Sequence, residues 1–106
     1  MAIAHLDGLQ IHDWESFHDV SASAFGFPPF YGRNMNAWID CVTYLDDGMS
    51  RFDLPPDEGL QIEVSNAKAF SANASEPFAA MMEAVAAVNR RSIADGKAAR
   101  ITLLLK

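Results

Sequence analysis

The side chains that could perform acid–base, nucleophilic or metal chemistry are few in this sequence and widely spaced. His5, His12 and His18 lie seven and six positions apart, so no helix would present two of them one turn apart, as a metal site requires. Nothing suggests a base or an oxyanion hole beside Cys41, whose more ordinary role is that of a small hydrophobic residue in a helix. The sequence also lacks a glycine-rich phosphate loop and a Gly-x-Ser-x-Gly motif. We therefore expect no metal, no cofactor and no catalytic residue, and interpret the protein as one that is not an enzyme.

A different set of polar residues falls on one expected helix, within the segment FYGRNMNAWIDCVTYL at residues 30–45. Asn34 suits the N-cap, because its side-chain oxygen can accept from an exposed N–H of the first turn, and the helix should run to about Leu45. At about 100° per residue, one face of this helix is apolar and should be core. That face consists of Met35, Trp38, Val42 and Leu45, with Cys41 at its edge. The opposite side carries a polar stripe of Asn36, Asp40 and Thr43.

A polar stripe can be merely the solvated side of an amphipathic helix, but its surroundings favour a binding surface. Between Asn34 and Ser50 the chain has three aspartates and no lysine or arginine, whereas an ordinary solvated face mixes both signs. The preceding loop, residues 26–33, is stiffened by Pro28 and Pro29 and rich in aromatic residues. Rigid aromatic rings beside isolated carboxylates suit the recognition of a basic protein.

The remaining sequence predicts the elements that must position this helix. We expect a strand at residues 2–6 ended by a tight turn at Asp7 and Gly8, and a helix from residue 13 to about residue 25 with Asp13 as N-cap. Residues 60–65 alternate apolar and polar side chains, as in a strand with one buried face. One or two helical turns should follow at residues 66–70, then a long helix capped by Ser75 and ended by Gly96. The last strand, residues 100–106, contains three consecutive leucines and is expected to be buried on both faces.

This order of elements favours an α/β fold. Strands separated by helices pair in parallel with right-handed crossovers, here as a three-stranded sheet covered by helices. With 106 residues, of which 50% are apolar and 21% charged, the chain should form a single domain over residues 1–106.

The charge distribution restricts the class of partner. The formal net charge is −6, and residues 34–58 carry six acids and one base, which makes the middle of the chain the acidic part. An acidic surface repels phosphates, so we expect no binding to nucleic acid or to an anionic membrane. No stretch approaches the ~18 apolar residues of a membrane span, and residues 1–11 lack the features of a signal peptide. We therefore expect a cytoplasmic protein, with which a lone cysteine agrees.

The segment at residues 30–45 resembles the signature of the barstar family, small intracellular inhibitors of secreted bacterial ribonucleases. In that family an aromatic-Tyr-Gly-x-Asn segment runs into a helix bearing Asp-Cys, and residues 30–34 and 40–41 match this pattern. The resemblance implies a barstar-like fold, a three-stranded parallel sheet packed with helices in the order βααβααβ. It further implies a one-to-one complex with a basic, extracellular-type ribonuclease and a free protein that is a monomer.

The resemblance also implies which residues bind. In the family, the loop and helix plug the ribonuclease active site, and the aspartate of Asp-Cys takes the place of a substrate phosphate. Matched to the motif, Asp40 is that aspartate, and Asn36 and Ile39 stand where barstar itself has an aspartate and a tryptophan. The expected partner-binding residues are Tyr31, Gly32, Asn34, Asn36, Ile39, Asp40 and Thr43.

Two further departures from the family pattern join those at Asn36 and Ile39, and together they leave the target open. Arg33 adds a positive charge where barstar has an acid, and Arg90 and Arg91 lie where an acidic residue late in the last helix contacts the enzyme. Two hypotheses remain: an inhibitor of a ribonuclease, and a barstar-fold module that binds a different basic protein.

Overall fold

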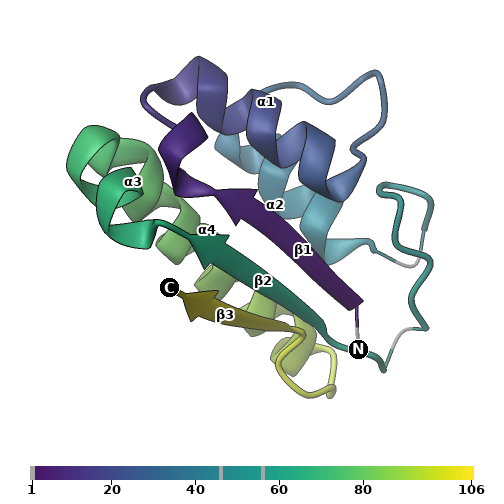
Figure 1. Cartoon of the computed structure of the whole chain (residues 1–106). Helices are drawn as coiled ribbons and strands as arrows, with labels where there is room; N and C mark the ends of the chain where they lie inside the picture. The colour runs from purple at the N-terminus through teal and green to yellow at the C-terminus, as the bar shows by residue number, and fades with distance from the viewer. Residues whose placement is uncertain (1, 46, 56) are drawn as a thin grey trace.

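A computed structural model describes residues 2–45, 47–55 and 57–106 of the chain (Figure 1). In chain order the elements are β1 (Ala2–Asp7), the short 3-10 helix η1 (Gly8–Gln10), α1 (Trp14–Phe25), α2 (Met35–Thr43), β2 (Leu60–Ser65), α3 (Ala67–Asn73), α4 (Ser75–Ala94) and β3 (Ile101–Leu105). This confirms the order βααβααβ. The expected tight turn after β1 is instead the 3-10 helix, in which the Asp7 side chain accepts from the Leu9 backbone.

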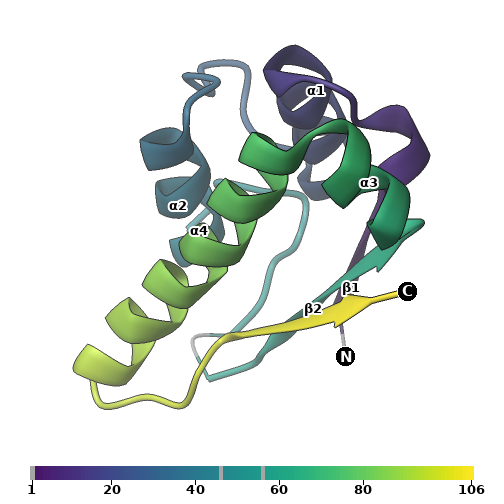
Figure 2. The ribbon, with the colours of Figure 1, turned by 90° about the vertical axis from the view of Figure 1, so that its left-hand side faces the viewer.

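The three strands form one parallel sheet in the order β1-β2-β3. The central strand β2 aligns Ile62 with Ala4 on β1 and with Leu103 on β3. Figures 1 and 2 show the helices gathered on one face of this sheet. Accordingly, Leu60, Ile62 and Val64 are buried, while the intervening residues of β2 are only partly covered.

The prediction that the last strand is buried on both faces is wrong. β3 lies at the edge of the sheet, and Leu104 and Leu105 are each 40% exposed. Leu104 belongs to the face that no helix covers, and Leu105 ends the strand. Only Ile101 of this strand is buried, because an edge strand on a sheet covered on one side has less to pack against.

Two of the three expected N-caps are confirmed. Asp13 accepts from Ser16 N and Ser16 Oγ accepts from Asp13 N, which together form a capping box at the start of α1. Asn34 Oδ1 accepts from Ala37 N at 2.8 Å at the start of α2. Ser75 is not a cap: it is already the first residue of α4, because Ala74 alone separates α4 from α3.

The end of α2 differs slightly from expectation, whereas the end of α4 agrees with it. α2 ends at Thr43 rather than near Leu45, although Leu45 is still fully buried. Asp46, expected to help end this helix, lies outside the described residues. Gly96 follows the end of α4 with a left-handed φ of 78°, as expected for a residue that terminates a helix.

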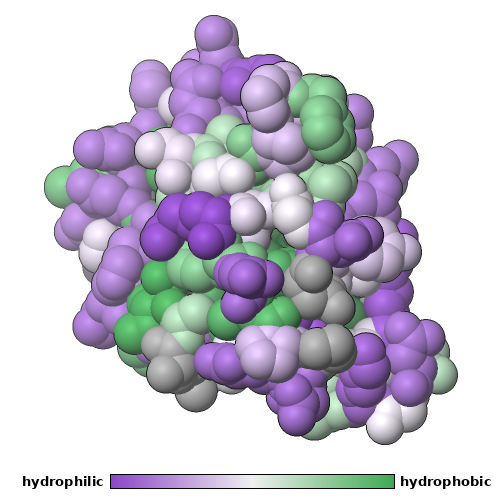
Figure 3. Space-filling model, turned by 90° about the vertical axis from the view of Figure 1, so that its right-hand side faces the viewer, coloured by the Kyte–Doolittle hydropathy of each residue, from purple (hydrophilic) through white to green (hydrophobic). Residues whose placement is uncertain are grey.

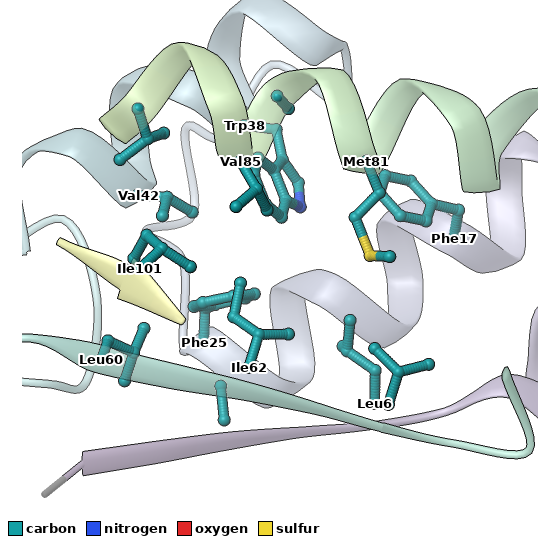
Figure 4. Packing of buried hydrophobic residues seen from close by; sticks show 14 of the residues in the cluster. Leu6, Phe17, Phe25, Trp38, Val42, Leu60, Ile62, Met81, Val85 and Ile101 are labelled. Atoms are coloured by element: carbon teal, nitrogen blue, oxygen red, sulfur yellow. The ribbon is translucent and has the colours of Figure 1, made fainter. Parts of the chain in front are cut away.

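The core lies between the helices and the covered face of the sheet. Figure 4 shows Trp38, Met81 and Val85 from α2 and α4 facing Leu6 and Ile62 of the strands. The expected apolar face of α2 is confirmed, because Trp38 is fully buried with its neighbours in the core and only Met35 is partly exposed.

The connector between α2 and β2 covers one side of this core. Viewed from that side, hydrophilic side chains surround a smaller hydrophobic region (Figure 3). Phe52 of the connector is 8% exposed, and the Arg51 guanidinium lies 4.1 Å from the centre of its ring. Arg51 Nε also donates to the Ala24 carbonyl at 2.9 Å, which ties the connector to the end of α1. The inner side of α2 is therefore enclosed, and its outer side is left open.

Candidate protein-binding surface

The loop before α2 is fastened to α1 by aromatic packing. The rings of Phe27 and Tyr31 lie 4.6 Å apart, and the Tyr31 hydroxyl is 2.6 Å from Nδ1 of the buried His18. The Trp14 ring is stacked with that of His18, with the ring centroids 6.1 Å apart. Tyr31 is therefore half-buried, and its hydroxyl is turned toward α1 rather than outward.

The protonation of this pair follows from its burial. Loss of solvent raises the pKa of Tyr31, and the same loss of solvent lowers the pKa of His18, with a further lowering from the nearby charge of Arg33. At neutral pH the phenol therefore keeps its proton and the imidazole is uncharged. The tautomer of the neutral imidazole sets which of the two groups donates in the hydrogen bond between the Tyr31 hydroxyl and Nδ1 of His18.

Arg33 makes the second attachment between the loop and α1. Its backbone has a left-handed φ of 54°, which is uncommon for a residue other than glycine. Its guanidinium lies 2.9 Å from Asp19 Oδ1 and donates to the Glu15 carbonyl at 3.2 Å. The positive charge that departs from the family pattern is thus paired within the chain.

An open hollow lies beside this loop at the N-terminal end of α2. Its volume is about 480 Å³, and it is lined by Trp14, Glu15, His18, Arg33, Asn34 and Met35. Asn34 is exposed at this hollow, and Gly32, also exposed, precedes it by two residues. A Cβ added at Gly32 would lie 3.2 Å from Asn34 Nδ2, so the loop is closely packed around the cap of α2.

The outer side of α2 carries the polar stripe that the sequence predicted. Asn36 and Asp40 are exposed, and Thr43 is half-buried one turn further along. The Thr43 hydroxyl donates to the Ile39 carbonyl at 2.6 Å. Ile39 itself is half-buried and borders a shallow hollow of about 270 Å³ between α2 and α4.

Asp40 is paired with a residue that the sequence had not linked to it. Arg91 Nη1 of α4 lies 2.9 Å from Asp40 Oδ1 and donates to Thr43 Oγ1 at 3.3 Å. Figure 2 shows α4 running beside α2, which brings these side chains together. Both partners stay about half exposed, with 53% for Asp40 and 47% for Arg91.

The structure thus places most of the expected binding residues on one continuous surface. Gly32 and Asn34 lie at the N-terminal end of α2, and the stripe follows along its outer side; Tyr31 is the exception, because its hydroxyl is directed inward. Arg91 and His18 are the residues that sequence reasoning missed. The resemblance had marked the position of Arg91 only as a departure, and no local signal indicated that it bonds to Asp40.

Neither a metal site nor a membrane span is found in the part of the chain that the structure describes. There, no group of three or more His, Cys, Asp or Glu side chains could hold a metal ion. No helix within the described ranges is long and apolar enough to cross a membrane. The site consists instead of the polar outer face of α2 and the stiff loop before it. The buried apolar side of α2 fixes the helix to the core.

Comparison with known proteins identifies the family. A family model described as Barstar (barnase inhibitor) matches residues 1–104 of the 106 residues. Among curated proteins the comparison found no match. The three-stranded parallel sheet with its helices agrees with the fold that the resemblance had implied. Because the family model covers nearly the whole sequence, this chain belongs to the barstar family.

Proposed function

We propose that this protein inhibits a basic ribonuclease by placing α2 and the preceding loop in the enzyme's active site. Asp40 takes the position of a substrate phosphate, flanked by Gly32, Asn34, Asn36 and Thr43, with Ile39 and Tyr31 supplying apolar contact. The observation that carries this proposal is the exposed carboxylate of Asp40 on the outer side of α2, in a chain of a family described as barnase inhibitors.

The rigidity of the surface supports this role. Trp38 and Val42 on the inner side of α2 are fully buried, so the helix is fixed to the core. The loop is held through Tyr31 and His18 and through Arg33 and Asp19. A surface that is already ordered loses little conformational entropy when it binds, so more of the contact energy appears as affinity.

The charge of the chain supports the choice of a basic partner. The formal net charge is −6, and residues 34–58 hold six of the acids. Such a surface raises the local concentration of a cationic protein and guides its approach. In this proposal the protein acts in the cytoplasm, is a monomer when free, cleaves no RNA itself and binds the ribonuclease one to one.

An RNA-cleavage assay tests the proposal. The purified protein is titrated against a panel of small basic ribonucleases that includes barnase, with cleavage of a fluorogenic RNA as the readout. We expect no cleavage by the protein alone and complete loss of activity of at least one ribonuclease at an equimolar ratio. A panel that stays fully active at a large excess of the protein would contradict the proposal.

A second function, binding of a different basic protein, is favoured by one observation. The Arg91 guanidinium adjoins Asp40, so the surface is not purely acidic. Capture of partners from the native cell on immobilised protein, followed by the RNA-cleavage assay on the captured material, separates the two functions. A captured basic protein without ribonuclease activity would favour this second function.

A further inference from the structure

The carboxylate on which the proposed inhibition depends is already occupied in the free protein. Arg91 reaches from α4 to Asp40 Oδ1 at 2.9 Å. Asp40 lies on α2, within a segment from Asn34 to Ser50 that has no lysine or arginine of its own. The cation that reaches this stripe therefore comes from a different element.

Arg91 is positioned by two acceptors of α2 that lie one turn apart. Its Nη1 contacts Asp40 Oδ1 and, at 3.3 Å, Thr43 Oγ1. Because the Thr43 hydroxyl gives its hydrogen to the Ile39 carbonyl, its oxygen lone pairs are free to accept from Arg91. These two contacts hold the guanidinium against the Asp40 carboxylate, the group that is expected to contact the partner.

Arg90, the neighbour with the same charge, is differently placed. It lines the hollow between α2 and α4 together with Ile39 and Glu83. Lys68 offers a more distant comparison, because it is exposed on α3. These two residues allow the effect of the Arg91 contact to be separated from the effect of one positive charge.

The ion pair between Arg91 and Asp40 is weak enough for a partner to break, yet Arg91 still affects which partner binds. A half-exposed ion pair contributes only modestly, so a partner can displace Arg91 from Asp40. A cation of the partner that takes Asp40 then lies close to the displaced guanidinium and is repelled by it. A partner with an anionic group beside its cation can pair with both Arg91 and Asp40. A partner with cations alone can pair only with Asp40.

We propose that Arg91 is a selectivity residue of this surface: it competes for Asp40 and disfavours partners that offer only positive charge. This inference rests on the proposed function of Asp40 as the residue that receives the partner's cation. The inference implies that the ribonuclease that binds this surface has a carboxylate next to the basic groups of its active site.

A tri-arginine peptide, which offers only cations, tests the competition without any ribonuclease. Binding is followed by the shifts of α2 backbone amides in NMR titrations of the wild type and of Arg91→Gln, Arg90→Gln and Lys68→Gln. We expect Arg91→Gln to bind the peptide about two- to fivefold more tightly than the wild type, the range that a half-exposed ion pair allows. The two control variants should gain clearly less, and the gain should vanish when Asp40→Asn is added to Arg91→Gln.

Several outcomes would overturn the inference. These are equal gains in all three single variants, a gain that persists without the Asp40 carboxylate, or no measurable binding of the peptide to Arg91→Gln. Thermal unfolding of each variant checks that the exposed substitution leaves the fold intact. The ribonuclease panel is read separately: if no enzyme is inhibited by the wild type or by Arg91→Gln, the proposed function fails, whatever the peptide titration shows.

Discussion

Asp40 is the side chain on which the proposed inhibition depends most. If its carboxylate fills a phosphate position, Asp40→Ala leaves several cationic groups of the ribonuclease buried and unpaired. Such a loss costs about 2–5 kcal/mol, a range drawn partly from the barnase–barstar pair itself, or roughly thirty-fold to several thousand-fold in affinity. We expect this loss to exceed that of any other single truncation between residues 30 and 45, as measured by calorimetry with the inhibited ribonuclease.

The control for this variant is Asp47→Ala, which removes an exposed aspartate beyond the end of α2. Its affinity should stay close to that of the wild type. The free energy of unfolding of Asp40→Ala should fall by less than about 1 kcal/mol, because its pair with Arg91 is half exposed. Equal, unchanged affinities of both variants would mean that the stripe is only a solvated helix face.

His18 is predicted to make the stability of the protein depend on pH. Burial lowers the pKa of His18 below its ordinary value of 6.5, so the unfolded chain takes up a proton before the folded one. The contribution of neutral His18 to the free energy of unfolding is therefore fully present above about pH 6.5. It is lost as the pH falls toward the pKa of His18 in the folded state. Urea unfolding of the wild type between pH 5 and pH 8 measures this loss, which should be smaller in His18→Gln.

His12 provides the comparison, because its side chain is exposed. His12→Gln should retain the wild-type dependence on pH. The prediction fails if the slope of stability against pH between 5 and 6.5 is the same in His18→Gln as in the wild type.

The elements themselves could be predicted from local patterns in the sequence. The alternation in residues 60–65 identified β2, and Asp13 and Asn34 identified the starts of α1 and α2. Each of these signals depends only on residues within one or two turns. The wrong predictions concern features that depend on neighbouring elements. The burial of β3 depends on its position at the edge of the sheet, and the cap predicted at Ser75 depends on how closely α3 precedes α4.

One asparagine of α4, Asn89, is hydrogen-bonded to the start of β3. Asn89 Oδ1 accepts from the backbone N–H groups of Arg100 and Ile101 at 2.9 and 2.7 Å, and Nδ2 donates to the Ile101 carbonyl at 3.0 Å. Asn89→Ala removes all of these bonds from a partly buried site, so we expect the free energy of unfolding to fall by about 1–3 kcal/mol. Denaturant unfolding measures this change.

Two variants sharpen this prediction. Asn89→Asp keeps an acceptor for the two N–H groups and should be destabilised less than Asn89→Ala. Asn73→Ala, an exposed position at the end of α3, should be nearly neutral. A loss of stability as small in Asn89→Ala as in Asn73→Ala would contradict the role of this side chain.

At the scale of the whole molecule, the candidate surface combines what the sequence could predict with what only the fold reveals. The stripe on α2 follows from helical periodicity within one segment. The pair of Asp40 with Arg91 requires α4 to lie beside α2, and the inward turn of Tyr31 requires α1 to present His18. Contacts between distant segments leave no period in the sequence, which is why these two features escaped prediction.

The overall charge predicts how salt should affect association with the ribonuclease. With a net charge of −6, the molecule attracts a basic partner before contact. Salt screens this attraction over the Debye length, about 10 Å at 0.1 M, whereas charges already packed in the complex are screened much less. Raising the salt from 0.05 to 0.5 M should therefore slow association far more than it speeds release, and stopped-flow kinetics measure both rates. This difference between the two rates is partly drawn from the barnase–barstar pair itself. An association rate that does not change with salt would show that the acidic surface does not steer the partner.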